Sequence, residues 1–255
     1  MIETLRSISK SENVEVLQVN TADAFLKAGF SASYFIAPLN TLRSRGELLS
    51  NSGFPVEWER AYRDSGYLSD PIPGLALALA SPIIWNKMPE DTVLSRAEQD
   101  YMDQLHAWGM ETGVGIVAYG PFSRTGFVGI GLPVSHAVAE APDTTLLRIV
   151  AQTSFTRYCD LILLELGDLP SLSPRELDVL IRIAEGKSKL VIANELEVSK
   201  DTVDTYFRRI YSKLDVSDRG AAVAAAVARG AVSLTDMRLS PEMIRRQPPG
   251  TVTED

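Results

Sequence analysis

Residues 172–230 read LSPRELDVLIRIAEGKSKLVIANELEVSKDTVDTYFRRIYSKLDVSDRGAAVAAAVARG, a run of short helical patterns that determines the architecture of this part of the chain. Ser173 supplies an N-cap, Pro174 stands at the first helical position, and Glu176 completes a capping box. A stripe of apolar side chains follows at helical spacing: Leu177, Leu180, Ile181 and Ala184. Gly186 ends this helix, because glycine readily adopts the left-handed conformation found at helix ends.

Three more helices are expected in the same stretch. The second begins near Ser188, Ser199 caps the third, and the fourth covers residues 217–229. The third helix has an inward apolar stripe: Val203, Phe207, Ile210 and Leu214. Its opposite face presents polar side chains: Asp201, Asp204, Thr205, Arg208 and Ser212. These are the parts of a helix-turn-helix, whose third helix enters a major groove about 12 Å wide. A small helical interaction module fits the spacing equally well.

The domain boundaries follow from the segments on either side of this helical stretch. Gly167, Pro170 and Pro174 interrupt two helical patterns, which is typical of a short linker. We therefore expect four segments, which are a sensor domain over residues 1–166, a linker over 167–172, a helix-turn-helix domain over 173–234 and a disordered tail over 235–255.

Residues 1–166 alternate between strand and helix patterns. Strands are expected over residues 31–38, 47–50, 114–119 and 127–132, and residues 121–126 between the last two have the composition of a hairpin loop. Helices are expected over residues 55–64, 95–109 and 143–166. Ser95 and Glu98 form a second capping box at the start of one of them. The predicted fold is an α/β sensor domain with a mixed or antiparallel sheet flanked by helices, followed by an all-α four-helix domain.

The composition excludes several classes of protein. An apolar fraction of 45% and a charged fraction of 23% over 255 residues are typical of a globular chain. The apolar run 75–85 contains Ser81 and Pro82 and is shorter than the roughly 18 residues that cross a bilayer. We expect no membrane contact and, because no secretory signal is visible, a cytoplasmic location. One cysteine and two histidines make a metal site unexpected.

The charge is unevenly distributed. Residues 1–170 carry 12 Lys and Arg against 20 Asp and Glu, whereas residues 171–234 carry 10 against 9. The acidic residues 1–170 are expected to form a domain that repels polyanions, whereas the nearly neutral residues 171–234 are expected to form one that tolerates them.

The helical stretch resembles the LuxR-type DNA-binding domain. The likeness rests on these motifs: Leu172-Ser173-Pro174-Arg175-Glu176, Ala184-Glu185-Gly186-Lys187-Ser188, Ile192-Ala193-x-x-Leu196, Val198-Ser199-x-x-Thr202-Val203 and Lys213-Leu214-x-Val216. The resemblance implies transcription regulation, with helix 199–213 in the major groove of double-stranded DNA and helix 217–229 available for dimer contact. It also implies a set of DNA-binding residues: Lys189, Lys200, Thr202, Thr205, Arg208, Arg209 and Lys213.

Within this set we expect different roles. Arg208 is the candidate for reading bases, and four residues are candidates for phosphate contacts: Lys189, Lys200, Arg209 and Lys213. For Lys189 and Lys200, an ordinary solvated lysine is an equal alternative. Asp204 stands where the family often has a basic or amide residue, so it is expected to face the polyanion.

The first domain resembles the autoinducer-binding domain of quorum-sensing LuxR regulators. The likeness rests on these elements: Phe54-Pro55-Val56-Glu57-Trp58-x-x-x-Tyr62, Gly66-Tyr67-x-x-Asp70-Pro71, Trp85, Gly109 and Gly113. The resemblance implies an N-acyl homoserine lactone as ligand and no cofactor. The residues expected at the ligand are Phe54, Trp58, Tyr62, Asp70, Trp85, Tyr101, Leu105 and Met110.

The chemistry of two of these residues suits a lactone. The indole N–H of Trp58 can only donate, which matches a lactone carbonyl, and an ionised Asp70 can only accept, which matches the ligand amide N–H. Phe54 stands where several members have tyrosine. Strand alternation places Phe127, Gly129 and Gly131 on one face, where the glycines either enlarge the cavity or let a helix approach closely.

The expected function is a ligand-responsive transcriptional regulator that binds DNA as a homodimer; contact with RNA polymerase is implied by the resemblance alone. The alternative is a regulator of the same type whose first domain binds a non-lactone ligand or a partner protein. An enzyme is not expected, because no nucleophile and acid are arranged around His106 or His136.

Overall fold

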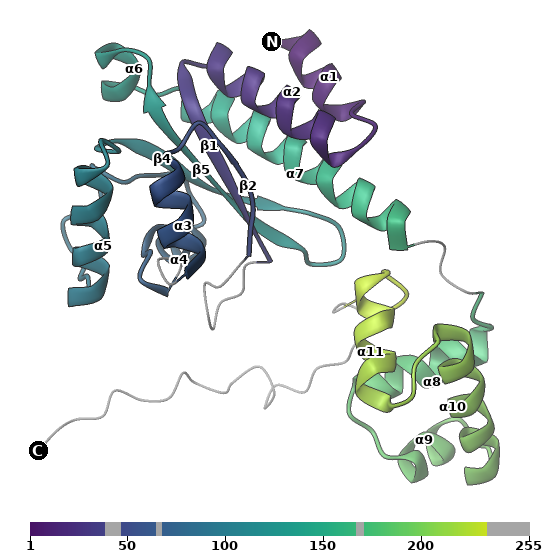
Figure 1. The fold of residues 1–255 in the computed structure, drawn as a ribbon. Helices are drawn as coiled ribbons and strands as arrows, with labels where there is room; N and C mark the ends of the chain where they lie inside the picture. Colours follow the sequence, from purple (N-terminus) through teal and green to yellow (C-terminus); the bar gives the residue numbers. More distant parts are fainter. Residues whose placement is uncertain (39–46, 65–67, 167–170, 234–255) are drawn as a thin grey trace, which may run out of the picture. The chain divides into compact units, whose positions relative to one another are not determined.

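The computed structural model describes residues 1–38, 47–64, 68–166 and 171–233, and the chain divides into two compact units, Met1–Glu165 and Leu166–Asp255 (Figure 1). Three features named above fall wholly or partly outside the described residues. These are the Gly66-Tyr67 pair, most of the 167–172 linker and the 235–255 tail.

The described part of the first unit contains a five-stranded sheet with the order β2-β1-β5-β4-β3. The strands are β1 (Phe30–Ala37), β2 (Glu47–Ser52), β3 (Ile83–Ile84), β4 (Gly113–Tyr119) and β5 (Thr125–Pro133). Each described pair of neighbouring strands is antiparallel, so of the two expected arrangements the antiparallel one is present. The β4–β5 hairpin turns at Phe122 and Ser123, which both have positive φ.

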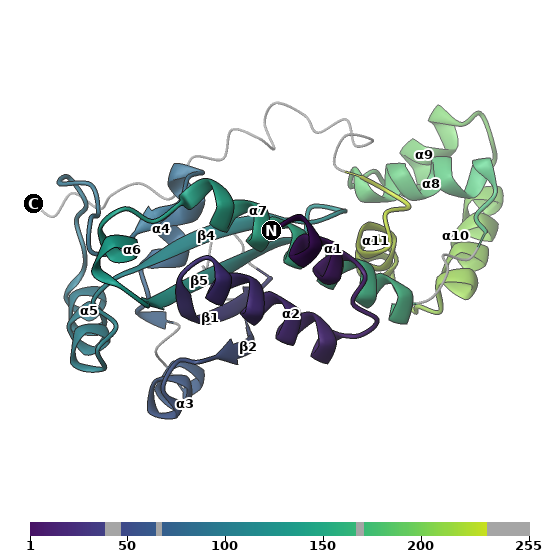
Figure 2. The same ribbon diagram turned by 90° about the horizontal axis from the view of Figure 1, so that it is seen from above.

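Helices cover both faces of this sheet (Figures 1 and 2). One face packs against α1 (Ile2–Ser9), α2 (Val14–Lys27) and α7 (Thr144–Leu166), through a core that includes Phe25, Val128 and Leu147. The other face packs against α3 (Val56–Asp64), α4 (Ile72–Leu79) and α5 (Arg96–Ala107), through a core that includes Trp58, Ile72 and Phe127. The short helix α6 (His136–Glu140) follows β5 and contributes Val138 to the first core. The sheet therefore separates two distinct hydrophobic layers.

The helices predicted over residues 55–64, 95–109 and 143–166 are confirmed as α3, α5 and α7. The Ser95–Glu98 capping box is present at the start of α5. Five elements of the first unit were not predicted: α1, α2, α4, α6 and β3. In α2 the apolar residues do not repeat clearly at helical spacing, because the apolar residues Val16 and Val19 lie on its exposed side. The apolar sequence of α4 runs round the whole helix and so shows no periodicity.

The described part of the second unit is a helical domain with its own core. It consists of α8 (Pro174–Ala184), α9 (Lys189–Glu195), α10 (Lys200–Leu214) and α11 (Arg219–Ala228) (Figure 1). The Ser173–Glu176 capping box is confirmed, and Ser199 caps α10 by accepting the backbone N–H of Thr202. The inward stripe of α10 is buried as predicted: Val203, Phe207, Ile210 and Leu214. Glu197 takes a positive φ of 55° in the tight turn between α9 and α10.

Over the described ranges, no helix has both the length and the apolar character needed to cross a membrane.

Candidate functional site

Every residue expected at the ligand lies on the same face of the sheet, opposite α1, α2 and α7. Each of these side chains is at most 5% exposed, and all but the acidic one belong to a single hydrophobic cluster. We call this group, together with Tyr34 and Phe127, the aromatic layer: Phe54, Trp58, Tyr62, Asp70, Trp85, Tyr101, Leu105 and Met110. The structure thus brings together residues from α3, α5, the strands and the start of α4.

Asp70 is the buried acid of the aromatic layer. The Tyr62 hydroxyl donates to its Oδ2 at 3.1 Å, and the Ile72 backbone N–H donates to its Oδ1 at 2.9 Å. Burial raises the pKa of Asp70 to about 7, although hydrogen bonds from Ile72, Tyr62, Tyr34 and Tyr101 act in the opposite direction. A carboxyl group in this position is a strong acceptor that changes charge close to neutral pH.

The two predicted tryptophans have different surroundings. The Trp58 indole Nε1 donates to the Tyr101 hydroxyl at 3.4 Å, a long bond beside the acid. The Trp85 indole Nε1 donates to the Met110 carbonyl at 3.3 Å, which anchors this ring to the segment before β4. Trp58 is therefore the tryptophan whose donor lies within the polar network around Asp70.

Tyr34 is a member of this site that the sequence reasoning missed. Its ring centroid lies 4.8 Å from that of Trp58, 5.3 Å from that of Phe54 and 5.9 Å from that of Tyr62. Burial, followed by the charge of Asp70, raises the pKa of the Tyr34 phenol well above its ordinary value. The alternation of side chains along β1 could have revealed Tyr34, because Ala32, Tyr34 and Ile36 share the face of this strand that joins the aromatic layer.

The glycines of the central strands face aromatic rings. A Cβ on Gly129 would lie 2.0 Å from Cε1 of Tyr34, and one on Gly131 would lie 2.7 Å from Cζ of Phe54. Both expectations for these glycines therefore need correction. They provide neither open cavity nor close helix approach; they make room for the rings of Tyr34 and Phe54.

In the second unit, α10 presents the predicted DNA-binding face. Arg208 and Arg209 are exposed, and Nη2 of Arg208 donates to Oγ1 of Thr205 at 3.3 Å. Thr205 in turn donates to the Asp201 carbonyl at 3.0 Å. Thr202 lies at the start of the helix, where its hydroxyl is 2.8 Å from that of Ser199. Lys200 is exposed beside it. The guanidinium of Arg208 is thus held on the outer face of α10.

Asp204, which is expected to face the polyanion, has a cationic partner inside the domain. It forms an ion pair with Lys189 of α9, and the Lys189 ammonium also lies 5.1 Å from the centre of the Phe207 ring. The hydrogen bond from Lys189 lowers the pKa of the Asp204 carboxyl. One of the predicted phosphate contacts therefore has a partner inside the domain, where it links α9 to α10.

Lys213 also has internal partners. Its ammonium donates to Oε2 of Glu176 at 2.7 Å and to the Ser171 carbonyl at 2.8 Å. Glu176 is 3% exposed; burial disfavours its charge, but the hydrogen bonds from Lys213 and Ser173 outweigh that cost and lower its pKa. This lysine neutralises a buried carboxylate of α8.

Fold and site together define a class of protein, which pairs a small-molecule sensor unit with a helix-turn-helix unit. Residues 20–157 match the family described as autoinducer binding domain, and residues 170–226 match that described as bacterial regulatory proteins, luxR family. The chain belongs to the LuxR family of bacterial regulators that carry an autoinducer-binding domain.

Similar proteins agree with this placement. The quorum sensing-dependent transcriptional regulator RpaR of Rhodopseudomonas palustris is 26% identical over 209 residues, which cover 81% of this chain and 84% of RpaR. The transcriptional activator protein BjaR1 of Bradyrhizobium diazoefficiens is 24% identical over 208 residues, which cover 80% of this chain and 84% of BjaR1. A putative HTH-type transcriptional regulator of Sinorhizobium fredii, y4qH, is 26% identical over 200 residues. That match covers 77% of this chain, which spans only 60% of the length of y4qH.

The solved structures show the same fold. Escherichia coli SdiA superposes with a TM-score of 0.67 at 19% identity, covering 90% of this chain and 96% of SdiA.

Proposed function

We propose that the chain is a ligand-responsive transcriptional regulator that senses an N-acyl homoserine lactone with its aromatic layer and binds DNA with α10. The observation that carries this proposal is the buried Asp70 carboxyl, surrounded by tyrosine hydroxyls and next to the Trp58 indole donor. A hydrophobic cluster of this size has no structural need for an acid, because burying a carboxylate costs free energy. A ligand with an amide N–H gives that acid a partner.

The chemistry of the site matches both ends of a lactone. The Trp58 indole N–H donates to the lactone carbonyl, and the Asp70 carboxylate accepts the amide N–H. A buried hydrogen bond to a charged group contributes about 1.5–3 kcal/mol, so Asp70 is the most sensitive position. Tyr62, Leu105 and Met110 supply apolar surface for the acyl chain.

The DNA-binding unit is proposed to work as part of a homodimer, since dimeric helix-turn-helix proteins match paired half-sites. Arg208 reads bases, and Lys200 and Arg209 contact phosphates, because these three cations are exposed on α10. Lys189 and Lys213 serve mainly to hold the domain together, through Asp204 and Glu176. A regulator of this kind works in the cytoplasm, where contact with RNA polymerase completes its action.

Thermal unfolding of the full-length protein with a panel of N-acyl homoserine lactones of increasing chain length tests the lactone proposal. We expect at least one lactone to raise the Tm, because a ligand at 100 times its Kd stabilises the folded state by about 2.7 kcal/mol. Trp58→Phe keeps a ring but removes the donor and should lose most of this stabilisation. Trp108→Phe, in the same cluster but outside the Asp70 network, is the matched control. A panel that leaves the wild-type Tm unchanged would instead favour a non-lactone ligand or a partner protein.

A further inference from the structure

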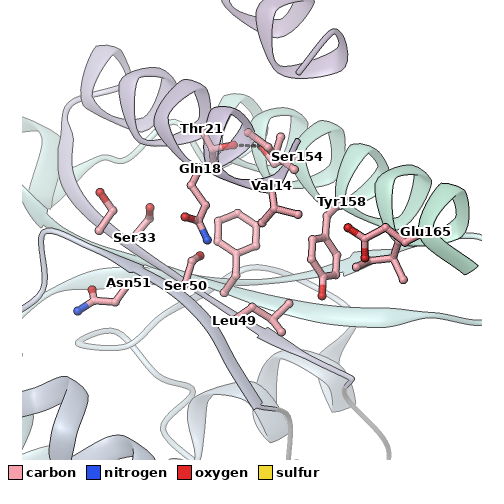
Figure 3. A pocket seen from close by; sticks show the side chains of 14 residues that line it. Val14, Gln18, Thr21, Ser33, Leu49, Ser50, Asn51, Ser154, Tyr158 and Glu165 are labelled. Carbon is pink, nitrogen blue, oxygen red and sulfur yellow. Dashed lines mark hydrogen bonds between the residues drawn. The ribbon is translucent and has the colours of Figure 1, made fainter. Parts of the chain in front are cut away.

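A cavity of about 240 Å³ lies on the opposite face of the sheet from the aromatic layer (Figure 3). Its walls come from α2, β1, β2 and α7. None of the residues assigned above to the lactone lines it. Its volume is just below the roughly 300–1,000 Å³ of common ligand pockets, so it suits a small molecule.

The edge of the sheet creates this cavity through small side chains and a bulge. Ser33 pairs with Ser52, and Phe35 pairs with Ser50, so three of these four lining positions carry only a hydroxymethyl group. The register of the strand pair then shifts by one residue on β2. Ile36 pairs with Leu48, so Leu49 has no partner on β1. A bulge re-aims the side chain at the extra position. Figure 3 shows Leu49 on the strand side of the cavity, across from Val14 and Tyr158 on the helix side.

Buried hydroxyl groups lie on the inner side of this cavity. Thr21 of α2 donates to the Ser154 hydroxyl of α7 at 2.9 Å, and both residues are at most 3% exposed (Figure 3). Ser33 is 4% exposed. A hydroxyl can donate once and accept twice, so this pair keeps hydrogen-bonding capacity for a ligand.

The rest of the lining determines what kind of molecule fits. Leu17, Phe35, Leu49 and Ile162 form apolar wall. Glu165 is the one carboxylate among the described lining residues, and no lysine, arginine or histidine is among them. An anionic ligand would meet a negative charge without a compensating cation, so the lining disfavours anions.

We propose that this cavity is a second ligand site, which binds a small neutral amphiphile. The polar group of the ligand lies toward Thr21, Ser33 and Ser154, and its apolar body packs against Phe35 and Leu49. The site joins α2 and α7 to the β1–β2 edge, so an occupant stabilises the sensor unit from the face opposite the lactone site.

Titration of the full-length, isotope-labelled protein with 1-octanol, followed by NMR, tests this proposal. We expect the backbone amide signals of Ser33, Leu49 and Ser50 to shift with saturation. The indole N–H signals of Trp58 and Trp85 should stay in place, because both lie in the aromatic layer. Octanoate, which has the same number of carbon atoms but is anionic, should bind at least tenfold more weakly.

Two variants sharpen the test. Ser50→Phe places a ring in the cavity from a half-buried position on an edge strand, where phenylalanine is well tolerated, and should abolish the amide shifts. Ser9→Phe, at an exposed position on α1, should leave them unchanged. Shifts of the indole signals, equal binding of octanoate, or amide shifts that persist in Ser50→Phe would each overturn the proposal. So would the absence of any amide shift up to the solubility of 1-octanol.

Discussion

Asp70 determines what the aromatic layer can do. A carboxyl at 5% exposure is costly when ionised, yet this one accepts hydrogen bonds from Tyr62 and from the Ile72 backbone. Asp70 could be singled out through the resemblance to the autoinducer-binding domain, because an acid that stands between aromatic residues and a proline is distinctive. The pKa of Asp70 could not be predicted in this way, because it is raised mainly by burial, which elements far apart in the sequence create together.

We predict that Asp70 makes the stability of the protein depend on pH. Its pKa is raised from 3.8 to about 7 in the fold, so between these values the folded protein holds a proton that the unfolded chain has released. The free energy of unfolding should therefore fall by about 1.4 kcal/mol per pH unit as the pH rises through this range, and then level off. Asp70→Asn removes this contribution, which denaturant unfolding between pH 5 and pH 8 measures.

The matched control is Asp103→Asn, at an exposed position on α5. Its stability should follow that of the wild type at every pH. Parallel curves for wild type and Asp70→Asn would show that Asp70 is already ionised across this range, contrary to our account.

At the scale of elements, short sequence motifs predicted the features that form within a single helix or hairpin. The two capping boxes and the β4–β5 hairpin depend on residues a few positions apart, and all three are present. Contacts between elements were harder to predict. The sequence did not reveal that Lys213 pairs with Glu176, because the two residues are 37 positions apart and only the packing of α8 against α10 joins them. The pairing of glycines with aromatic rings depends likewise on which strands are neighbours.

We predict that Gly129→Ala destabilises the sensor unit. The new methyl would lie 2.0 Å from the Tyr34 ring, and overpacking of this kind costs about 1–3 kcal/mol. Tyr34→Leu should recover part of the loss in the double variant, as measured by denaturant unfolding. Gly220→Ala is the control, because the new methyl would meet only the end of the Asp218 side chain, 3.3 Å away, which a small shift relieves, and alanine favours helix. A Gly129→Ala protein as stable as the wild type would refute this packing.

We also predict that Lys213 acts on stability and not on DNA affinity. Lys213→Met keeps the apolar stem but leaves the buried Glu176 carboxylate without its cationic partner, at a cost of about 1–3 kcal/mol. The slope of DNA affinity against salt concentration should stay unchanged.

Arg209→Met is the comparison for this variant. It should leave stability unchanged and reduce the salt slope by about one, because Arg209 is exposed and free to contact a phosphate. If Lys213→Met instead reduced the salt slope without loss of stability, Lys213 would be a phosphate contact after all.

At the scale of the whole molecule, each described unit has its own core and its own chemistry. The sheet of the first unit separates an aromatic layer with a buried acid from a second layer under α2 and α7. The second unit packs a separate helical core and exposes Arg208 on α10. The division into a sensor and a DNA-binding part was visible in the sequence, because the linker and the change to short helices are local features. The identity of the ligand that we propose for the aromatic layer depends on the shape of that layer, which no local pattern specifies.

The most direct test of the proposed lactone site is mass spectrometry of organic extracts from the full-length protein after expression with a panel of acyl homoserine lactones. We predict that the wild type and the Asp103→Ala control retain one lactone, and that Asp70→Ala, although folded, retains none. Retention of the same lactone by Asp70→Ala, or no lactone from a folded wild type, would contradict the account.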